Sequence, residues 1–197
     1  MGKGATTRAA ILSQAAAMAS VRGLEGLSIG RLATTAKLSK SGLFGHFGSK
    51  EALQRAVLEH VVEDFRNHVI LPALKAPTGV ERLRALFAAW LDWSEAPSRA
   101  GGCPLLGATI ELDDRPGALR DYLVDRQKSW LDGIARMATR AMADGDFEPT
   151  LDTAQFAFEF NNVGLGFNFA HRLLGEPNAR RQARSAFERL LRSASTA

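Results

Sequence analysis

The sequence contains little cysteine and no long apolar run. Its one cysteine, Cys103, cannot form a disulfide within the chain, and such usage is typical of proteins from a reducing cytoplasm. Charged or polar residues interrupt every apolar stretch of the 197 residues, and the mean hydropathy is −0.10, so we expect no membrane-spanning helix and no membrane partner. The first residues lack the apolar segment of a secretory signal. We therefore predict a soluble, cytoplasmic protein.

The sequence also lacks the short motifs of common enzyme classes. It has no glycine-rich dinucleotide or phosphate loop, no GxSxG nucleophile motif and no HExxH zinc motif. The four histidines, His46, His60, His68 and His171, are not spaced as metal ligands usually are. We therefore predict no catalytic residue, no metal and no cofactor. An enzyme whose site is assembled from distant parts of the chain is the alternative.

Positive charge is concentrated in the first third of the chain. Residues 1–60 carry eight basic and three acidic side chains, whereas residues 61–197 carry 17 basic and 18 acidic ones. A basic module joined to a nearly neutral body predicts one part that binds a polyanion and a second part with a different role. A solvated basic surface without a partner is the alternative on charge alone.

Apolar residues recur at helical spacing almost throughout, and no alternating run bounded by hairpin turns is present. The sequence therefore predicts an all-α fold. Helices are expected from Thr6 or Thr7 to Gly23, from Ser28 to Ala36, from about 40 to 47, from Ser49 to Pro72, and at about 80–95, 104–112, 118–143, 152–174 and 178–193.

Two short helices joined by Lys37-Leu38-Ser39 fit a helix-turn-helix, whose second helix enters the major groove of DNA. The residues are more specific than the pattern: Gly26-Leu27-Ser28-Ile29-Gly30-Arg31-Leu32-Ala33, then Leu38-Ser39-Lys40-Ser41-Gly42-Leu43-Phe44-Gly45-His46-Phe47-Gly48-Ser49-Lys50-Glu51-Ala52-Leu53. These segments closely resemble the DNA-binding head of the TetR (tetracycline-repressor) family over about residues 7–55.

The resemblance implies a DNA-binding transcriptional regulator with two parts. Residues 1–50 would form a three-helix helix-turn-helix domain, and residues 51–197 a helical domain for ligand binding and dimerisation. The protein would be a homodimer that binds a palindromic double-stranded DNA operator, most often as a repressor, and leaves it when a small-molecule effector binds. An adaptor that keeps the dimer scaffold without binding DNA is an alternative.

Five residues at the starts of the two short helices are candidate DNA contacts. Lys40, Ser41 and Gly42 open the recognition helix, where side chains reach base edges and glycine permits close approach of the backbone to DNA. Ser28 and Ser39 are helix caps, and a cap hydroxyl with the N–H groups beside it can also meet a phosphate. Base readout is therefore expected at residues 40–42.

Three further candidates follow from the resemblance. The family usually has a tyrosine that contacts a phosphate where this chain has Phe44, so that hydrogen bond is lost; Phe44 either presses on a thymine methyl or sugar or packs in the core. His46 matches the family's histidine, and Lys50 a lysine that reaches a phosphate. A purely structural histidine and a solvated lysine are the alternatives. Lys37, in the turn, either adds a phosphate contact or points to solvent.

The second domain is rich in aromatic residues and has few polar anchors, which indicates an apolar ligand site or an ordinary aromatic core. Asn161 and its neighbour Asn162 would be costly to bury alone, so we expect at least one of them to bind a ligand, a water or the other subunit. The candidate ligand-binding residues are Phe87, Trp90, Trp130, Phe158 and Asn161.

The two C-terminal helices carry more apolar surface than one buried stripe requires. In the TetR family, which the head resembles, these helices often pair with the same helices of a second subunit to form a four-helix bundle. Gly164 and Gly166 would permit close approach of the helix backbones. We therefore expect Phe167 and Leu190 at a dimer interface, with an intramolecular core as the alternative.

Overall fold

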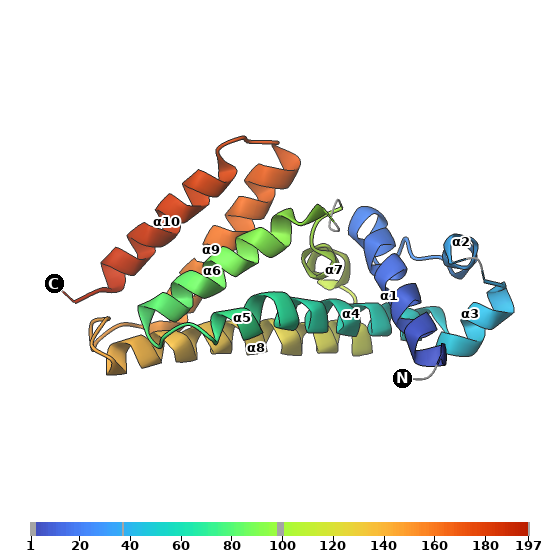
Figure 1. Cartoon of the computed structure of the whole chain (residues 1–197), viewed down its shortest axis with the longest axis horizontal. Helices are drawn as coiled ribbons and strands as arrows, with labels where there is room; N and C mark the ends of the chain where they lie inside the picture. Colours follow the sequence, from blue (N-terminus) through green and yellow to red (C-terminus); the bar gives the residue numbers. More distant parts are fainter. Residues whose placement is uncertain (1–2, 37, 98–100, 197) are drawn as a thin grey trace. The chain divides into compact units, whose positions relative to one another are not determined.

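The computed structural model describes the backbone of residues 3–36, 38–97 and 101–196, and within these ranges the side chains from residue 8 onward (Figure 1). In this part of the chain the regular structure is helical, with one isolated β-bridge between Phe147 and Ser195, which confirms the all-α prediction. The α-helices are α1 (Lys3–Arg22), α2 (Ile29–Thr35), α3 (Lys40–Phe47), α4 (Lys50–Phe65), α5 (Leu71–Ala73), α6 (Val80–Glu95), α7 (Pro104–Leu112), α8 (Ala118–Ala143), α9 (Thr153–Asn168) and α10 (Ala179–Ala194). Two short π-helical segments are η1 (Arg66–Ile70) and η3 (Phe169–Leu173).

The chain forms two compact units, Met1–Phe65 with Glu95–Asp125, and Arg66–Ser94 with Arg126–Ala197. The first unit therefore holds α7 and the start of α8 as well as the first four helices. The predicted boundary between the DNA-binding domain (residues 1–50) and the regulatory domain (residues 51–197) does not coincide with this division into two units. That boundary stays a prediction.

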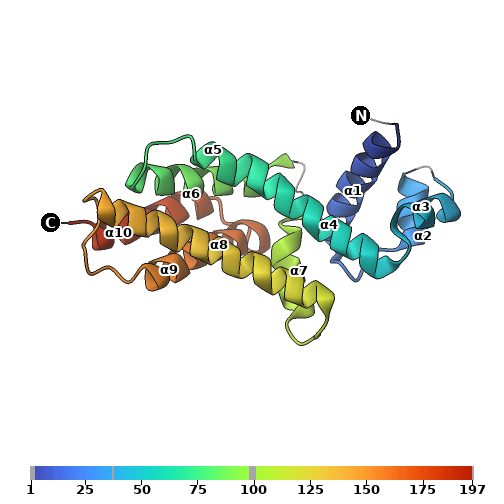
Figure 2. The same cartoon turned by 90° about the horizontal axis from the view of Figure 1, so that it is seen from below.

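The first unit is built around α1 and α4. Figure 2 shows α7 beside α4, and α7 contacts both α1 and α4. Apolar side chains from all four N-terminal helices are buried in this unit; they include Ile11, Ala15, Leu32, Leu43, Leu53 and Val57. Burial of one such face per helix fixes the helix-turn-helix on its support.

Serine hydroxyls begin the helices of the head, as their positions in the sequence predict. Ser28 Oγ accepts a hydrogen bond from the backbone N–H of Arg31 at 3.5 Å, and Ser39 Oγ accepts one from Gly42 at 3.0 Å. Gly48 ends α3 with φ of +73°, a conformation that an L side chain rarely adopts. The short helices and their turn are thus specified locally.

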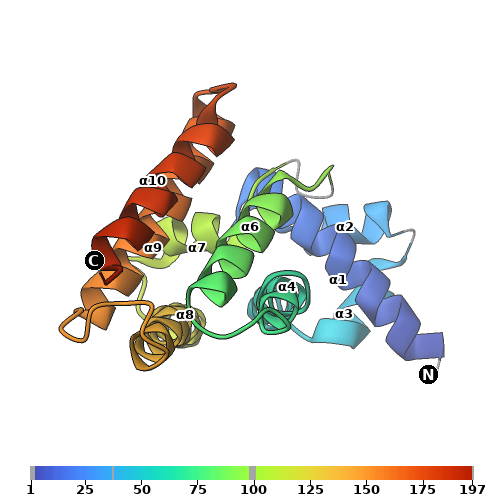
Figure 3. The same ribbon diagram turned by 60° about the vertical axis from the view of Figure 1, so that its left-hand side comes forward.

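The second unit contains α6, α9, α10 and the C-terminal part of α8. Figure 3 shows α9 and α10 side by side, with α6 next to them. Arg84 of α6 donates two hydrogen bonds to the carboxylate of Glu188 in α10, at 3.1 and 3.2 Å, and a third to Glu81 at 2.7 Å. The hydrogen bond to Glu188 is the main reason that the pKa of Arg84 is raised above its ordinary value.

The helix boundaries differ from the predicted ones in two places. The helix α1 begins at Lys3, ahead of the predicted caps Thr6 and Thr7, whose side chains lie outside the described residues. The long helix that begins after Ser49 continues through η1 and α5 and ends at Ala73, one residue beyond the predicted end at Pro72. Pro72 is the second residue of α5 and directly follows the π-helical turn η1 and Leu71.

Candidate nucleic-acid interface and effector site

The recognition helix α3 turns one side to the core and the other to solvent. Leu43 is only 1% exposed, whereas the next residue, Phe44, is 53% exposed. Core packing of Phe44, one of the two predicted alternatives, is therefore wrong for this chain. The exposed side of α3 holds six of the residues named from the sequence or adjacent to them: Lys40, Ser41, Gly42, Phe44, Gly45 and His46.

Two features of α3 make its backbone accessible. A Cβ added at Gly45 would meet no atom within 4 Å, so the helix surface at this position is bare. The hydroxyls of Ser39 and Ser41 lie 3.1 Å apart at the start of the helix. An exposed helix N-terminus with exposed hydroxyls and little side-chain cover can come close to DNA.

Lys40 lies differently from the other α3 residues. Its Cε is 3.4 Å from the position that a Cβ at Gly30 would take, so the side chain extends across to the start of α2. Ser28, the cap of α2, is nearby, since its Oγ is 3.8 Å from the same position. The lysine charge therefore lies where the two short helices begin.

An open groove of about 870 Å³ runs along the end of α1, the following loop and the start of α2. Its lining residues are Arg22, Glu25, Gly26, Leu27, Ser28, Ile29, Gly30, Arg31 and Lys50. Sequence reasoning did not single out Arg22, Arg31 or Glu25. The concentration of basic residues in the first third of the chain was the only signal for the two arginines, and no signal pointed to Glu25.

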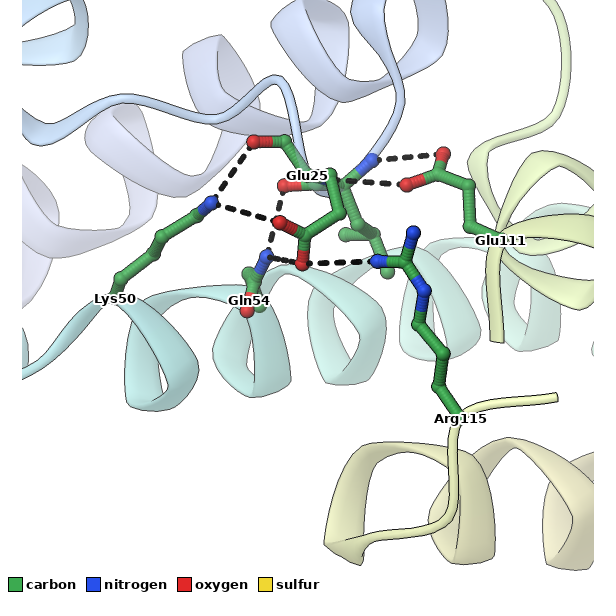
Figure 4. A network of polar contacts seen from close by, with 6 residues as sticks. Glu25, Lys50, Gln54, Glu111 and Arg115 are labelled. Atoms are coloured by element: carbon green, nitrogen blue, oxygen red, sulfur yellow. Dashed lines mark hydrogen bonds and ion pairs between the residues drawn. The ribbon is translucent and has the colours of Figure 1, made fainter. Parts of the chain in front are cut away.

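Lys50 is paired in this structure. Its ammonium donates hydrogen bonds to the backbone carbonyl of Glu25 at 2.9 Å and to Glu25 Oε2 at 3.1 Å (Figure 4). Lys50 thus has partners within the chain although its side chain stays exposed, and the choice between a phosphate contact and a solvated lysine stays a prediction. The same hydrogen bond is the largest cause that lowers the pKa of Glu25, and a hydrogen bond from Gln54 is the next.

The loop that carries Glu25 is held by residues from α7 and the turn after it. Both carboxylate oxygens of Glu111 accept backbone N–H bonds, from Leu24 at 3.0 Å and from Glu25 at 2.9 Å. Arg115 approaches Glu25 Oε1 at 3.8 Å, opposite the side on which Lys50 lies in Figure 4. A C-terminal segment of the first unit thus fixes a loop of its DNA-binding head.

In the second unit, four of the five predicted ligand-binding residues lie together. The rings of Trp90 and Trp130 are 5.3 Å apart in an edge-on arrangement, and Phe87 lies 6.4 Å from Trp90. Trp130 Nε1 donates to Asn161 Oδ1 at 3.0 Å. Phe160, which the sequence did not single out as a ligand residue, packs against all three of these rings.

Phe158 is not brought to this cluster. It is 59% exposed, and at 100° per residue it points about 160° away from its buried helix neighbours Phe156 and Phe160. The density of aromatic residues in the sequence suggested a single group, but the helical phase separates Phe158 from it. The helical phase of these residues follows from their spacing in the sequence, so this difference could have been predicted.

Asn161 and Asn162, at least one of which we expected to bind a ligand, a water or the other subunit, both make hydrogen bonds within the chain, and that expectation stays a prediction. Asn161 Oδ1 accepts from the indole of Trp130 at 3.0 Å, and Asn162 Nδ2 donates to the backbone carbonyl of Phe158 at 2.8 Å. Both amides therefore have partners within the chain.

Phe167 and Leu190 are core residues of the second unit. They are 3% and 8% exposed, which supports the intramolecular alternative over the dimer interface predicted for them. Gly164 is buried against Trp90, whose ring would overlap any added Cβ. Gly166, in contrast, has open space at the corresponding position.

Among the described residues, no group of three or more histidine, cysteine, aspartate or glutamate side chains could hold a metal ion. No helix in this part of the chain is long and apolar enough to cross a membrane. The turn residue Lys37 lies outside the described residues.

Two family models match the sequence. Residues 11–57 match the model of bacterial regulatory proteins of the tetR family, and residues 79–187 match the tetracyclin repressor-like C-terminal domain. The second match alone covers more than half of the chain. The chain therefore belongs to the TetR family, as the residues of its head suggested.

Solved structures extend the similarity over almost the whole chain. A TetR transcriptional regulator from Chloroflexus aurantiacus is 27% identical, with a TM-score of 0.85 over 97% of this chain and 95% of that one. AibR, solved with isovaleryl coenzyme A and operator DNA, is 24% identical, with a TM-score of 0.73 over 91% and 95% of the two chains. A transcriptional regulator from Saccharomonospora viridis, solved with choline, is 19% identical, with a TM-score of 0.83 over 98% and 100%. A search of curated proteins found no match.

The fold, the exposed recognition helix and the family agree on one class of protein. This chain is a DNA-binding transcriptional regulator of the TetR family, with an N-terminal helix-turn-helix and a helical C-terminal part. The family and these structural relatives are regulators rather than enzymes.

Proposed function

We propose that this regulator is a repressor that binds a palindromic operator as a homodimer and leaves it when a small, mostly apolar molecule binds. The observation that carries the proposal is the exposed side of α3, where Phe44 and Ser41 point outward from a helix anchored by buried Leu43. Such a helix can enter a major groove without rearranging its own core. Because its target is chromosomal DNA, we also propose that the protein acts in the cytoplasm.

Each DNA contact has a proposed role. Ser41 and Phe44 contact base edges and thymine methyl groups, and Gly42 lets the backbone come close to them, because all three are exposed on α3. Lys40 is assigned to both bases and phosphates, since its side chain extends from α3 toward Gly30. The proposed phosphate contacts are Ser28, Ser39, His46 and Lys50, which lie at helix ends or on the exposed side of the head. We retain residues 1–50 as the DNA-binding domain and residues 51–197 as the regulatory domain.

The proposed dimer uses the outer face of α9 and the segment that follows it. Phe158, Asn162, Gly166, Phe169 and Leu173 recur at intervals of four, four, three and four residues, so they form one stripe. The apolar members of the stripe are 54–73% exposed in the single chain. The bare surface at Gly166 permits close approach of a second helix. A second copy of this chain would cover the stripe and place two recognition helices for a two-fold symmetric operator.

The effector is proposed to bind beside the aromatic cluster of the second unit, at Phe87, Trp90, Trp130 and Asn161. Trp90 and Trp130 are each partly exposed, so the cluster has an accessible edge. An effector could replace the indole of Trp130 as the partner of Asn161. The ligands of the two relatives, isovaleryl coenzyme A and choline, differ in charge and size, so they indicate no single effector class.

All three tryptophans, Trp90, Trp93 and Trp130, belong to the second unit, so intrinsic fluorescence is a reporter for effector binding there. A panel of apolar acids, acyl coenzyme A esters and quaternary amines would be titrated in the presence and absence of operator DNA. The proposal expects one compound to change the fluorescence and to bind more weakly, by roughly 5- to 150-fold, when the operator is present. In vitro transcription from a template with the operator should fall on addition of the protein and recover with that compound. Increased transcription on addition of the protein would contradict the repressor assignment.

A further inference from the structure

The groove along the end of α1 and the start of α2 contains an acid among its basic residues. Among its lining residues, Arg22, Arg31 and Lys50 are basic, and Glu25 is acidic. A carboxylate in such a position repels a phosphate and competes with it for the same cations.

Glu25 holds Lys50 through two acceptors. The Lys50 ammonium donates to the Glu25 carbonyl at 2.9 Å and to its carboxylate at 3.1 Å, and Gln54 Nε2 donates to the other carboxylate oxygen at 3.3 Å. Gln54 also donates to the carbonyl of Leu24 at 2.9 Å, so its side chain is fixed on the same loop. Lys50 can contact a phosphate only by sharing or leaving this arrangement.

A second cation is ready to hold the same carboxylate. Arg115, in the turn between α7 and α8, lies 3.8 Å from Glu25 Oε1. This distance is too long for a hydrogen bond but within the range of an ion pair. Figure 4 shows Lys50 and Arg115 approaching the carboxylate from different sides. Glu111 meanwhile fixes the backbone of the loop through the N–H groups of Leu24 and Glu25. The carboxylate can therefore change its cation while its backbone stays in place.

We infer that Glu25 is an internal competitor of the operator phosphate for Lys50, and that Arg115 promotes DNA binding by taking over the Glu25 carboxylate when Lys50 moves to the phosphate. This inference rests on the proposed role of Lys50 as a phosphate contact. It gives the α7–α8 turn a direct influence on the charge that the head presents to DNA. The influence is moderate, because both side chains of the pair are about half exposed.

The test uses the full-length protein and a duplex selected from a random pool. Glu25→Gln keeps the size and an acceptor oxygen of the side chain but removes its charge, so we expect binding roughly two- to five-fold tighter. The slope of log affinity against log salt concentration (the salt slope) should steepen by up to about one unit. The reason is that the Glu25 side chain no longer carries the charge that holds Lys50 away from a phosphate. Arg115→Gln should weaken binding by a similar factor. Both effects should vanish in a Lys50→Gln background, and the Arg115→Gln effect should vanish in a Glu25→Gln background.

Glu51→Gln is the matched control, because it removes one exposed acid from the same head next to Lys50 in sequence. Any change that it causes should persist in the Lys50→Gln background, as expected for a general charge effect. If Glu25→Gln behaves in the same way, or leaves affinity unchanged while the wild type binds the duplex, the inference is wrong and the proposed function stands. If the folded wild type binds no duplex, the proposed function fails and this inference fails with it.

Discussion

The indole N–H of Trp130 donates a hydrogen bond to Oδ1 of Asn161 over 3.0 Å, which joins α8 to α9 within the second unit. Replacement of Asn161 by leucine would leave this partly buried donor without its acceptor. We expect Asn161→Leu to lower the free energy of unfolding by about 1 kcal/mol, toward the lower end of such penalties because both residues retain some exposure. Urea denaturation followed by circular dichroism measures this change.

Thr139→Val is the matched control, since Thr139 is exposed and its hydroxyl donates to the carbonyl of Ala135 in its own helix at 3.0 Å. It should change stability by less than about 0.5 kcal/mol. Equal losses for the two variants would show that the bond to Trp130 has no particular importance. Effector titrations of Asn161→Leu must be compared at equal dimer content.

Neighbouring residues of the recognition helix should have separable roles. Leu43→Ala opens the buried core of the head and should cost about 2–5 kcal/mol of stability. Phe44→Ala removes an exposed ring, so it should leave the unfolding midpoint nearly unchanged while weakening binding to the operator. Thermal unfolding and fluorescence anisotropy distinguish these effects. Loss of stability in Phe44→Ala without loss of DNA affinity would assign Phe44 to the fold instead.

Ser41 and Lys50 should differ in how they affect DNA binding. Ser41→Ala should alter the preference among selected operator variants, at a cost of roughly 1–3 kcal/mol for a lost base contact. Lys50→Ala should weaken binding to all duplexes by similar factors and lower the salt slope by about one unit. Competition binding against a set of operator variants measures both. A change of sequence preference in Lys50→Ala would reassign this lysine to base readout.

A charge on the exposed stripe of α9 and η3 should prevent dimerisation without unfolding the chain. Leu173→Glu places a carboxylate on a residue that is 73% exposed in the single chain, so each protomer should stay folded while the dimer dissociates. Sedimentation velocity with circular dichroism checks both points. Ile110→Glu is the control, because Ile110 is equally exposed, at 74%, but belongs to the first unit. An intact dimer in Leu173→Glu would place the interface elsewhere.

The Glu25 network predicts a specific pH dependence of stability. The hydrogen bond from Lys50, followed by that from Gln54, lowers the pKa of Glu25 from its ordinary value of 4.5. The carboxylate therefore contributes stability above pH 4.5, and this contribution is lost as the pH falls through the lower pKa of the folded state. Glu25→Gln and Lys50→Gln should each reduce the loss of stability between neutral and acidic pH in urea titrations. An unchanged loss in both variants would contradict this assignment.

Local features of the fold could be predicted from the sequence. The caps Ser28 and Ser39 act within three residues of their own positions, so their hydrogen bonds follow from local pattern. The helix boundaries were predicted for the same reason. The π-helical turn η1 ahead of Pro72 was not predicted, because it has no clear signal in the sequence.

Contacts between distant residues could not be predicted in this way. Glu25 and Lys50 are 25 positions apart, Trp130 and Asn161 are 31 apart, and Glu111 bonds to a backbone N–H 87 positions away. Each pairing depends on how helices pack, which the pattern of one segment does not specify. Sequence reasoning therefore found Lys50 but not the acid that holds it, and found Asn161 but predicted a partner outside the chain.

Binding to selected and scrambled duplexes tests the central claim most directly. Duplexes would be selected from a random pool with the wild-type protein, and affinity for the selected sequence and its scrambled form would be measured at about 50 and about 200 mM salt. We predict a palindromic selected site, bound at least roughly a thousand-fold more tightly than its scrambled form at the higher salt, with affinity for both falling steeply as salt rises. Equal affinity for the two duplexes would contradict specific operator recognition by α3.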